Sequence, residues 1–139
     1  MIIYLLNILL IDHEKDSLRF VQKYLESKGA HVSAYSDPLL ALQNFMKNNN
    51  SNDNNYYDLV ISDIRMPEMN GVELVSSIRK MNKDIPIILM SASSDIADTD
   101  HSILNFLNIE DITIKPVKLK DLIEKINTVK QKVILKHLG

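Results

Sequence analysis

The segment YYDLVISDIRMPEMNGVEL, residues 56–74, decides the fold of this chain. Its apolar run at 59–62 is short and continuous, which predicts a buried strand. The strand ends at Asp63, and the Pro, Asn and Gly residues that follow predict a turn. Apolar residues at helical spacing begin after Gly71, so a helix should follow the turn. This segment therefore presents a single carboxylate at the tip of a strand.

The same alternation of strand and helix runs along the whole chain. Apolar runs predict strands at residues 3–11, 31–35, 59–62, 85–90 and 112–114. Helical spacing predicts helices at 15–28, from 38, after 71, at 96–107 and from 118 to about 135. This alternation is typical of an α/β protein with a parallel sheet. Three of the strands are almost wholly apolar, which indicates that helices cover both faces of the sheet.

Two of the predicted helices carry further expectations. Asp37 followed by Pro38 predicts a helix start, and the buried side of that helix is expected to comprise Leu39, Leu42 and Phe45 or Met46. Poor helix formers at residues 98–100 predict that the helix at 96–107 is displaced or mobile.

Length and composition set the class of protein. The chain has 139 residues, of which 45% are hydrophobic and 24% charged, as expected of one globular domain over residues 1–139 with an Asn-rich loop at about 48–55. A net charge of −2 gives no reason to expect direct binding to nucleic acid. The apolar opening MIIYLLNILLI is too short to insert across a membrane. The absence of cysteine excludes thiolate chemistry, and three glycines are too few for a Gly-rich nucleotide loop.

Polar residues follow several of the predicted strands. Asp12 and His13 follow the first, Asp63 ends the third, Ser91 follows the fourth and Lys115 follows the fifth. Ligand sites in open parallel sheets lie at these carboxyl ends, so the side chains should meet at one edge. A carboxylate can attack phosphorus when cations offset the repulsion between the two anions, and a lysine with a bound Mg²⁺ suits that task.

Four segments carry a resemblance to a known family. In order and spacing, ILLIDHE (8–14), the segment 56–74, IILMSAS (87–93) and DITIKPV (111–117) resemble the receiver (CheY-like) domain of two-component response regulators. The resemblance covers nearly the whole chain. It implies a flavodoxin-like (βα)5 fold, in which a doubly wound, five-stranded parallel sheet has the order 2-1-3-4-5 and helices on both faces.

The resemblance also implies roles for individual residues. Asp63 would be the phosphoacceptor, Lys115 would contact the phosphoryl group, and Ser91 would be the switch hydroxyl. Asp12, Asp63 and the backbone carbonyl of Arg65 would hold Mg²⁺ or Mn²⁺. The Lys115–Pro116 peptide bond is expected to be cis, as is usual in the family.

Two positions depart from the family pattern. His13 stands where a second acid usually contacts the metal, and because imidazole is a poor ligand for Mg²⁺ it should weaken binding or alter the choice of metal. Whether His13 is itself a ligand stays open, and the next residue, Glu14, is expected to point away from the site. Ile112 replaces the usual aromatic residue, so the coupling between Ser91 and the surface should differ from the family's.

The leading hypothesis is a phosphorelay receiver in the cytoplasm, not an enzyme. A histidine kinase or phosphotransfer protein would phosphorylate Asp63, and a downstream protein would bind the face formed by residues 96–107, 112–114 and 118–135. The chain would act as a monomer or a phosphorylation-linked homodimer, without an effector domain. The alternative is a pseudo-receiver, a constitutive interaction or dimerisation module. It would have lost efficient phosphotransfer because of His13 and Ile112.

Overall fold

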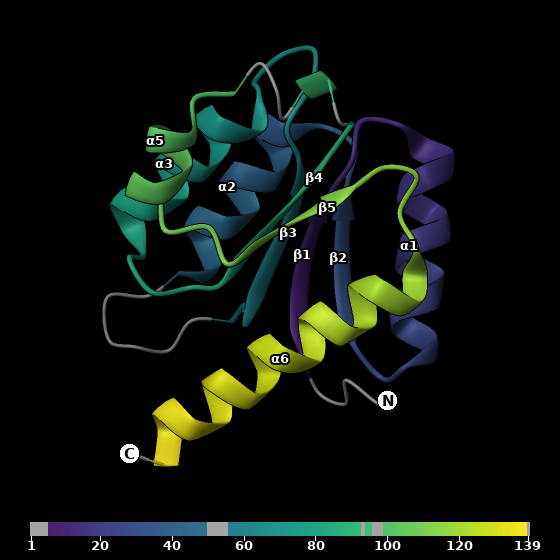
Figure 1. Cartoon of the computed structure of the whole chain (residues 1–139), viewed down its shortest axis with the longest axis vertical. Helices are drawn as coiled ribbons and strands as arrows, with labels where there is room; N and C mark the ends of the chain where they lie inside the picture. Colours follow the sequence, from purple (N-terminus) through teal and green to yellow (C-terminus); the bar gives the residue numbers. More distant parts are fainter. Residues whose placement is uncertain (1–5, 50–55, 93, 96–98, 139) are drawn as a thin grey trace.

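The computed structural model describes residues 6–49, 56–92, 94–95 and 99–138. Its centre is a sheet of parallel strands in the order β2-β1-β3-β4-β5, which confirms the predicted topology (Figure 1). The strands are β1 (Asn7–Ile11), β2 (His31–Tyr35), β3 (Leu59–Asp63), β4 (Ile87–Ser91) and β5 (Asp111–Ile114). Four of them differ by one to four residues at an end from the predicted ranges, and residues 3–5 of the first prediction lie outside the described residues.

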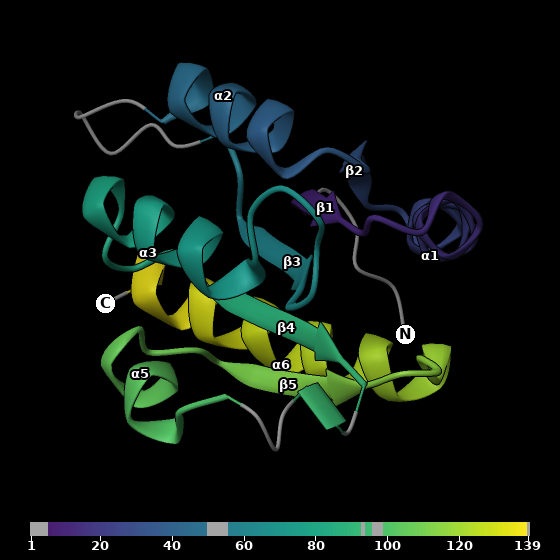
Figure 2. The same ribbon diagram turned by 90° about the horizontal axis from the view of Figure 1, so that it is seen from above.

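Helices cover both faces of the sheet, as predicted. They are α1 (Lys15–Ser27), α2 (Pro38–Asn48), α3 (Gly71–Met81), α5 (His101–Phe106) and α6 (Leu119–Leu138). Buried residues of α1 and α6 form one core with the sheet, and those of α2, α3 and α5 form the other. Figure 2 shows α2 and α3 on the side of the sheet away from α6.

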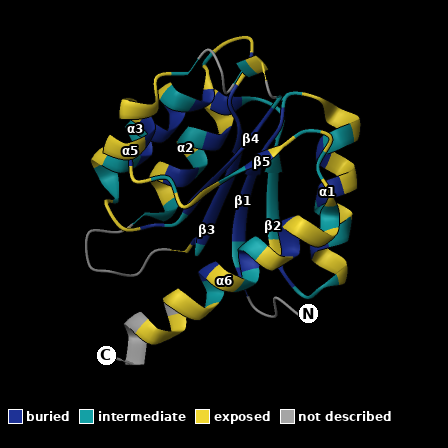
Figure 3. Ribbon diagram, viewed as in Figure 1, coloured by how far each residue is buried: buried dark blue, intermediate teal, exposed yellow. Residues whose placement is uncertain are grey.

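The central strands are buried on both faces, which explains their continuous apolar sequences. In β1, Ile8 and Leu10 pack toward α1 and α6, whereas Leu9 and Ile11 pack toward α2 and α3. All residues of β3 and β4 are buried, and these strands are dark blue in Figure 3. Because helices cover both faces of β1, β3 and β4, the centre of the sheet is closely packed up to the carboxyl ends that present polar residues.

The prediction for the buried side of α2 was partly wrong. Asp37 caps the helix through the backbone N–H of Leu39, as expected, but the side chain of Leu39 is 43% exposed. The buried residues of α2 are Pro38, Ala41 and Phe45, and Phe45 stacks on Tyr57 with ring centroids 6.2 Å apart. Burial of the aromatic pair turns the helix so that the buried side begins one residue earlier than predicted.

The helix between β4 and β5 is shorter than its predicted range. It begins after Asp100, whose carboxylate accepts the N–H of Ser102, and residues 96–98 of the prediction lie outside the described residues. Arg79 of α3 fixes the other end, because its guanidinium donates to the carbonyls of Leu107 (2.7 Å) and Asn108 (3.1 Å). The start follows from the capping acid Asp100, because its carboxylate accepts a backbone N–H that has no partner within the helix.

Gly71 allows α3 to begin against the end of β3. Its N–H donates to the carbonyl of Ile64 at 2.6 Å, and a Cβ added there would lie 2.1 Å from the backbone oxygen of Asp63. A side chain at this position therefore collides with the backbone that holds the Asp63 carboxylate.

Gly71→Ala should lower the free energy of unfolding by about 1 to 3 kcal/mol, because the methyl group must push away the backbone at Asp63. Helix propensity alone predicts the opposite sign. Chemical denaturation beside Ser76→Ala, on the same helix, measures the difference. A stabilised Gly71→Ala variant would contradict the steric argument.

Candidate functional site

Two carboxylates lie side by side at the reversal of strand order, where β1 pairs with both β2 and β3. Asp12 directly follows β1 and is fully buried, and Asp63 ends β3 with 3% exposure. Their backbones are fixed by the sheet, since the N–H of Asp12 donates to the carbonyl of Tyr35 and the N–H of Ile64 donates to that of Met90. The fold thus holds two acids at the place where ligands of such sheets bind.

Lys115 contacts both acids from the end of β5. Its ammonium lies 2.8 Å from Oδ1 of Asp63 and 3.2 Å from each carboxylate oxygen of Asp12. The N–H of Lys115 donates to the carbonyl of Ser91, and the Lys115–Pro116 peptide bond is cis, as expected. The ammonium therefore offsets two buried negative charges at once. Burial of either carboxylate without a partner would cost free energy.

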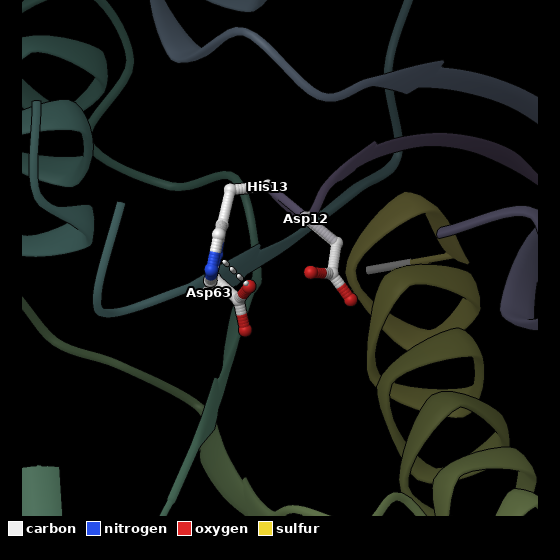
Figure 4. A group of neighbouring side chains, drawn as sticks. All are labelled: Asp12, His13 and Asp63. Carbon is white, nitrogen blue, oxygen red and sulfur yellow. Dashed lines mark hydrogen bonds and ion pairs between the residues drawn. The ribbon is translucent and has the colours of Figure 1, made fainter. Parts of the chain in front are cut away.

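His13 contacts the other oxygen of Asp63. Its Nδ1 lies 3.1 Å from Oδ2 of Asp63, and Figure 4 shows the imidazole reaching the carboxylate from above. The side chain of His13 is 34% exposed, so it lies at the boundary between the buried acids and solvent. Lys115 and His13 accordingly hold different oxygens of the same carboxylate.

Glu14 corrects one prediction, because its side chain does not point away from the site. Its Oε1 lies 3.7 Å from Nζ of Lys115, and its backbone N–H donates to Oδ1 of Asp12. The expectation extended the alternation of β1 past its end, whereas Glu14 is the residue that precedes α1 and the chain already turns there. A strand followed at once by a helix start was the signal in the sequence.

Ser91 and Arg65 lie on the neighbouring segments. Ser91 is buried, and its hydroxyl donates to the carbonyl of Ala92 at 2.8 Å. Arg65 forms an ion pair with Asp95 at 2.8 Å, which joins the segment after β3 to the segment after β4. This pair could not be predicted from the sequence, since the residues are distant in sequence and nothing in either segment marks a partner.

Burial and mutual charge shift the pKa values of the two acids apart. Burial raises the pKa of Asp63 to about 7, and the neighbouring Asp12 carboxylate adds to the rise while Lys115 opposes it. Burial also acts to raise the pKa of Asp12, but hydrogen bonds with Asp63, Ser17 and the backbone of Glu14 hold it below its ordinary value. A divalent cation at these acids would therefore favour the ionised, nucleophilic form of Asp63.

Among the residues that the structure describes, Asp12, His13 and Asp63 form a group that could hold a metal ion. One ligand atom from each lies within 4.8 Å of the others. The two carboxylates suit Mg²⁺, which commonly takes one or two carboxylates and keeps several waters. The imidazole of His13 does not match that preference, because nitrogen ligands favour transition metals.

A hollow of about 180 Å³ lies beside these residues. His13 lines it together with Ser36, Asp37, Pro38, Pro67 and Glu68. It connects the imidazole face of the site with solvent. The hollow lies on the His13 side of the site, whereas Lys115 contacts the oxygen of Asp63 that His13 does not contact.

Comparison with known families matches residues 8–127 to the response regulator receiver domain. The response regulator SaeR of Staphylococcus aureus strain USA300 is 30% identical over 121 residues, which cover 87% of this chain and 49% of SaeR. The chain therefore spans about half the length of the curated relatives it matches.

Two solved structures extend the likeness. The response regulator receiver domain protein of Clostridium thermocellum has a TM-score of 0.79 and 29% identity, covering 94% of this chain and 99% of its own. The response regulator TrrA of Thermotoga maritima, in complex with Mg²⁺-BeF, has a TM-score of 0.75 and 29% identity, covering 90% of this chain and 99% of its own.

The raised pKa of Asp63 predicts how stability depends on pH without metal. The protonated carboxyl stabilises the fold fully below its ordinary pKa of 3.8, and this contribution is lost as the pH rises through about 7. The lowered pKa of Asp12 acts in the opposite sense, but only below 3.8. Between about pH 4.5 and 7.5, the free energy of unfolding of the wild type should fall by roughly 1 to 4 kcal/mol more than that of Asp63→Asn, which lacks the titrating carboxyl.

Urea denaturation in chelator across this range measures the difference. Asp121→Asn, which changes an exposed acid on α6, should keep the wild-type pH dependence. Identical pH dependence in Asp63→Asn and the wild type would contradict the assignment of the raised pKa to Asp63.

Proposed function

Because the chain belongs to the family of response regulator receiver domains, we propose that it accepts a phosphoryl group on Asp63 and so switches its contacts with other proteins. The observation that carries the proposal is the buried carboxylate of Asp63, with the Lys115 ammonium 2.8 Å from one of its oxygens. The donor would be a histidine kinase or a phosphotransfer protein, as the family relationship suggests.

The phosphoryl group would pass to Asp63 by direct displacement at phosphorus. An oxygen of Asp63 forms the new P–O bond while the P–N bond of the donor phosphohistidine breaks, and the departing imidazole takes a proton. Lys115 offsets the charge that gathers on the carboxylate and the phosphoryl oxygens. Asp12 fixes Lys115 in place by contacting the ammonium with both oxygens.

A divalent cation belongs to this proposal. Asp12, Asp63 and the backbone carbonyl of Arg65 are the groups that would hold Mg²⁺ or Mn²⁺. When bound, such an ion supplies positive charge that eases the approach of the phosphoryl group to a carboxylate. His13 supplies an imidazole where the family usually has an acid, so we expect Mg²⁺ to bind weakly.

Ser91 would pass the signal to the surface. Its hydroxyl now donates to the carbonyl of Ala92, and it would turn to a phosphoryl oxygen on Asp63. The adjoining segment carries Asp95 and leads to α5. Ile112 packs beside the core that α5 shares, so the response would pass through this packing without an aromatic residue. The face formed by α5, β5 and α6 would then bind the downstream partner or a second copy of the chain.

The alternative is a pseudo-receiver, an interaction or dimerisation module with little or no phosphotransfer. The contact that favours it is His13 Nδ1 at 3.1 Å from Asp63, because the imidazole takes up the oxygen that Lys115 leaves free. Either function suits a single receiver unit over residues 1–139. No helix among the described residues is long and apolar enough to span a membrane, and we propose that the chain works in the cytoplasm.

Incubation with a small acyl-phosphate donor and a divalent cation should add one phosphoryl group to the wild type and none to Asp63→Asn. The reason is that Asp63 is the carboxylate held against the Lys115 ammonium at 2.8 Å. Intact mass spectrometry, with and without chelator, measures the adduct. Asp121→Asn is the matched control and should be phosphorylated like the wild type.

An adduct that persists in Asp63→Asn would contradict the assignment of the acceptor. A wild type that gains no adduct, together with a His13→Asp variant that does, would favour the pseudo-receiver.

A further inference from the structure

We propose that this site selects a divalent transition metal over Mg²⁺, with Nδ1 of His13 as a direct ligand beside Oδ2 of Asp63. The inference concerns the metal of the proposed receiver function and rests on it for its biological meaning. One donor of this site is an imidazole nitrogen, whereas Mg²⁺ prefers oxygen ligands.

The two donor atoms have the spacing of neighbouring ligands around one ion. Nδ1 of His13 and Oδ2 of Asp63 lie 3.1 Å apart. Adjacent ligands of an octahedral ion at 2.0–2.1 Å are separated by about 3 Å. An ion can therefore bind both atoms with little movement of either side chain.

Nδ1 of His13 and Oδ2 of Asp63 contact each other, and an ion would have to bind between them. Lys115 lies 2.8 Å from Oδ1 of Asp63, so the ammonium contacts the other oxygen of the carboxylate. Asp12 brings a third donor atom within 4.8 Å of the other two. On the solvent side, the 180 Å³ hollow is lined by the acids Asp37 and Glu68, which favour the entry of a cation.

The chemistry of the donors then decides the ion. One imidazole nitrogen with two carboxylates is a mixed site, and affinity for nitrogen ligands rises from Mn²⁺ through Co²⁺ and Ni²⁺. Mg²⁺ is a hard ion that gains little from imidazole and keeps its water. Replacing the usual second acid by His13 also removes one negative charge. This lowers the affinity for Mg²⁺ more than the affinity for an ion that binds nitrogen.

Isothermal titration calorimetry with Mg²⁺, Mn²⁺ and Co²⁺ on the full chain tests the proposal. The wild type should bind Co²⁺ at least about tenfold more tightly than Mg²⁺. His13→Ala should lose most of the affinity for Co²⁺ and little of that for Mg²⁺, whereas His13→Asp should bind Mg²⁺ more tightly and lower the Co²⁺-to-Mg²⁺ ratio by about tenfold or more.

Spectroscopy identifies the ligand independently of affinity. The chain has four histidines and no cysteine, so bound Co²⁺ should shift the ring signals of one histidine far more than the others in proton NMR spectra. That signal should be missing in both His13 variants. His101→Ala, which removes an exposed imidazole on α5, is the matched control and should bind like the wild type. Thermal melts in chelator check that every variant is folded.

Equal Co²⁺-to-Mg²⁺ ratios in the wild type and His13→Ala would overturn the proposal, as would a His13 ring signal that Co²⁺ leaves unshifted. The phosphorylation assay separates this failure from that of the proposed function. Phosphorylation in Mg²⁺ without any effect of His13 on metal choice overturns the metal inference alone. Co²⁺ binding through His13 in a chain that no donor phosphorylates with any of the three ions overturns the receiver function alone.

Discussion

The burial of two carboxylates against one ammonium is the constraint on which the rest of this site depends. Asp12 and Asp63 lose their hydration at the end of the sheet, and Lys115 offsets part of the free-energy cost by contacting both. The sheet holds all three backbones close together, since each residue lies at the end of a strand or directly after one. The two acids can therefore bind a further cation. They lie together because β1 and β3 end at the same edge of the sheet, where β5 also ends before Lys115.

His13, which departs from the pattern expected of the family, contacts the second oxygen of Asp63. An imidazole meets that oxygen at 3.1 Å, so the choice of metal and the reactivity of Asp63 depend on the same atom. Metal binding through His13 would join the two properties, since an ion at Oδ2 would also favour the ionised carboxylate. Ile112, the second residue that departs from the pattern expected of the family, packs against the core that includes α5.

Much of the fold could be predicted from the sequence, because apolar runs and turn residues are local signals. The strand at 31–35 and the start of α2 at Pro38 follow from such signals alone, and the family pattern supplied the strand order. The buried side of α2 and the contact of Glu14 could not be predicted in this way. The first depends on the stacking of Phe45 on Tyr57, and the second on the direction of the chain beyond β1. The Arg65–Asp95 pair likewise arises only when two distant segments meet.

The central claim is that Asp63 is the carboxylate that receives the phosphoryl group, and reductive trapping tests it most directly. Borohydride reduces an acyl phosphate to an alcohol, so a phosphorylated aspartate becomes homoserine and can be located by peptide sequencing in a mass spectrometer. The account predicts homoserine at position 63 alone after treatment with an acyl-phosphate donor. Homoserine at position 12, or the reduced product of Glu14, would contradict it and assign the acceptor to another acid around Lys115.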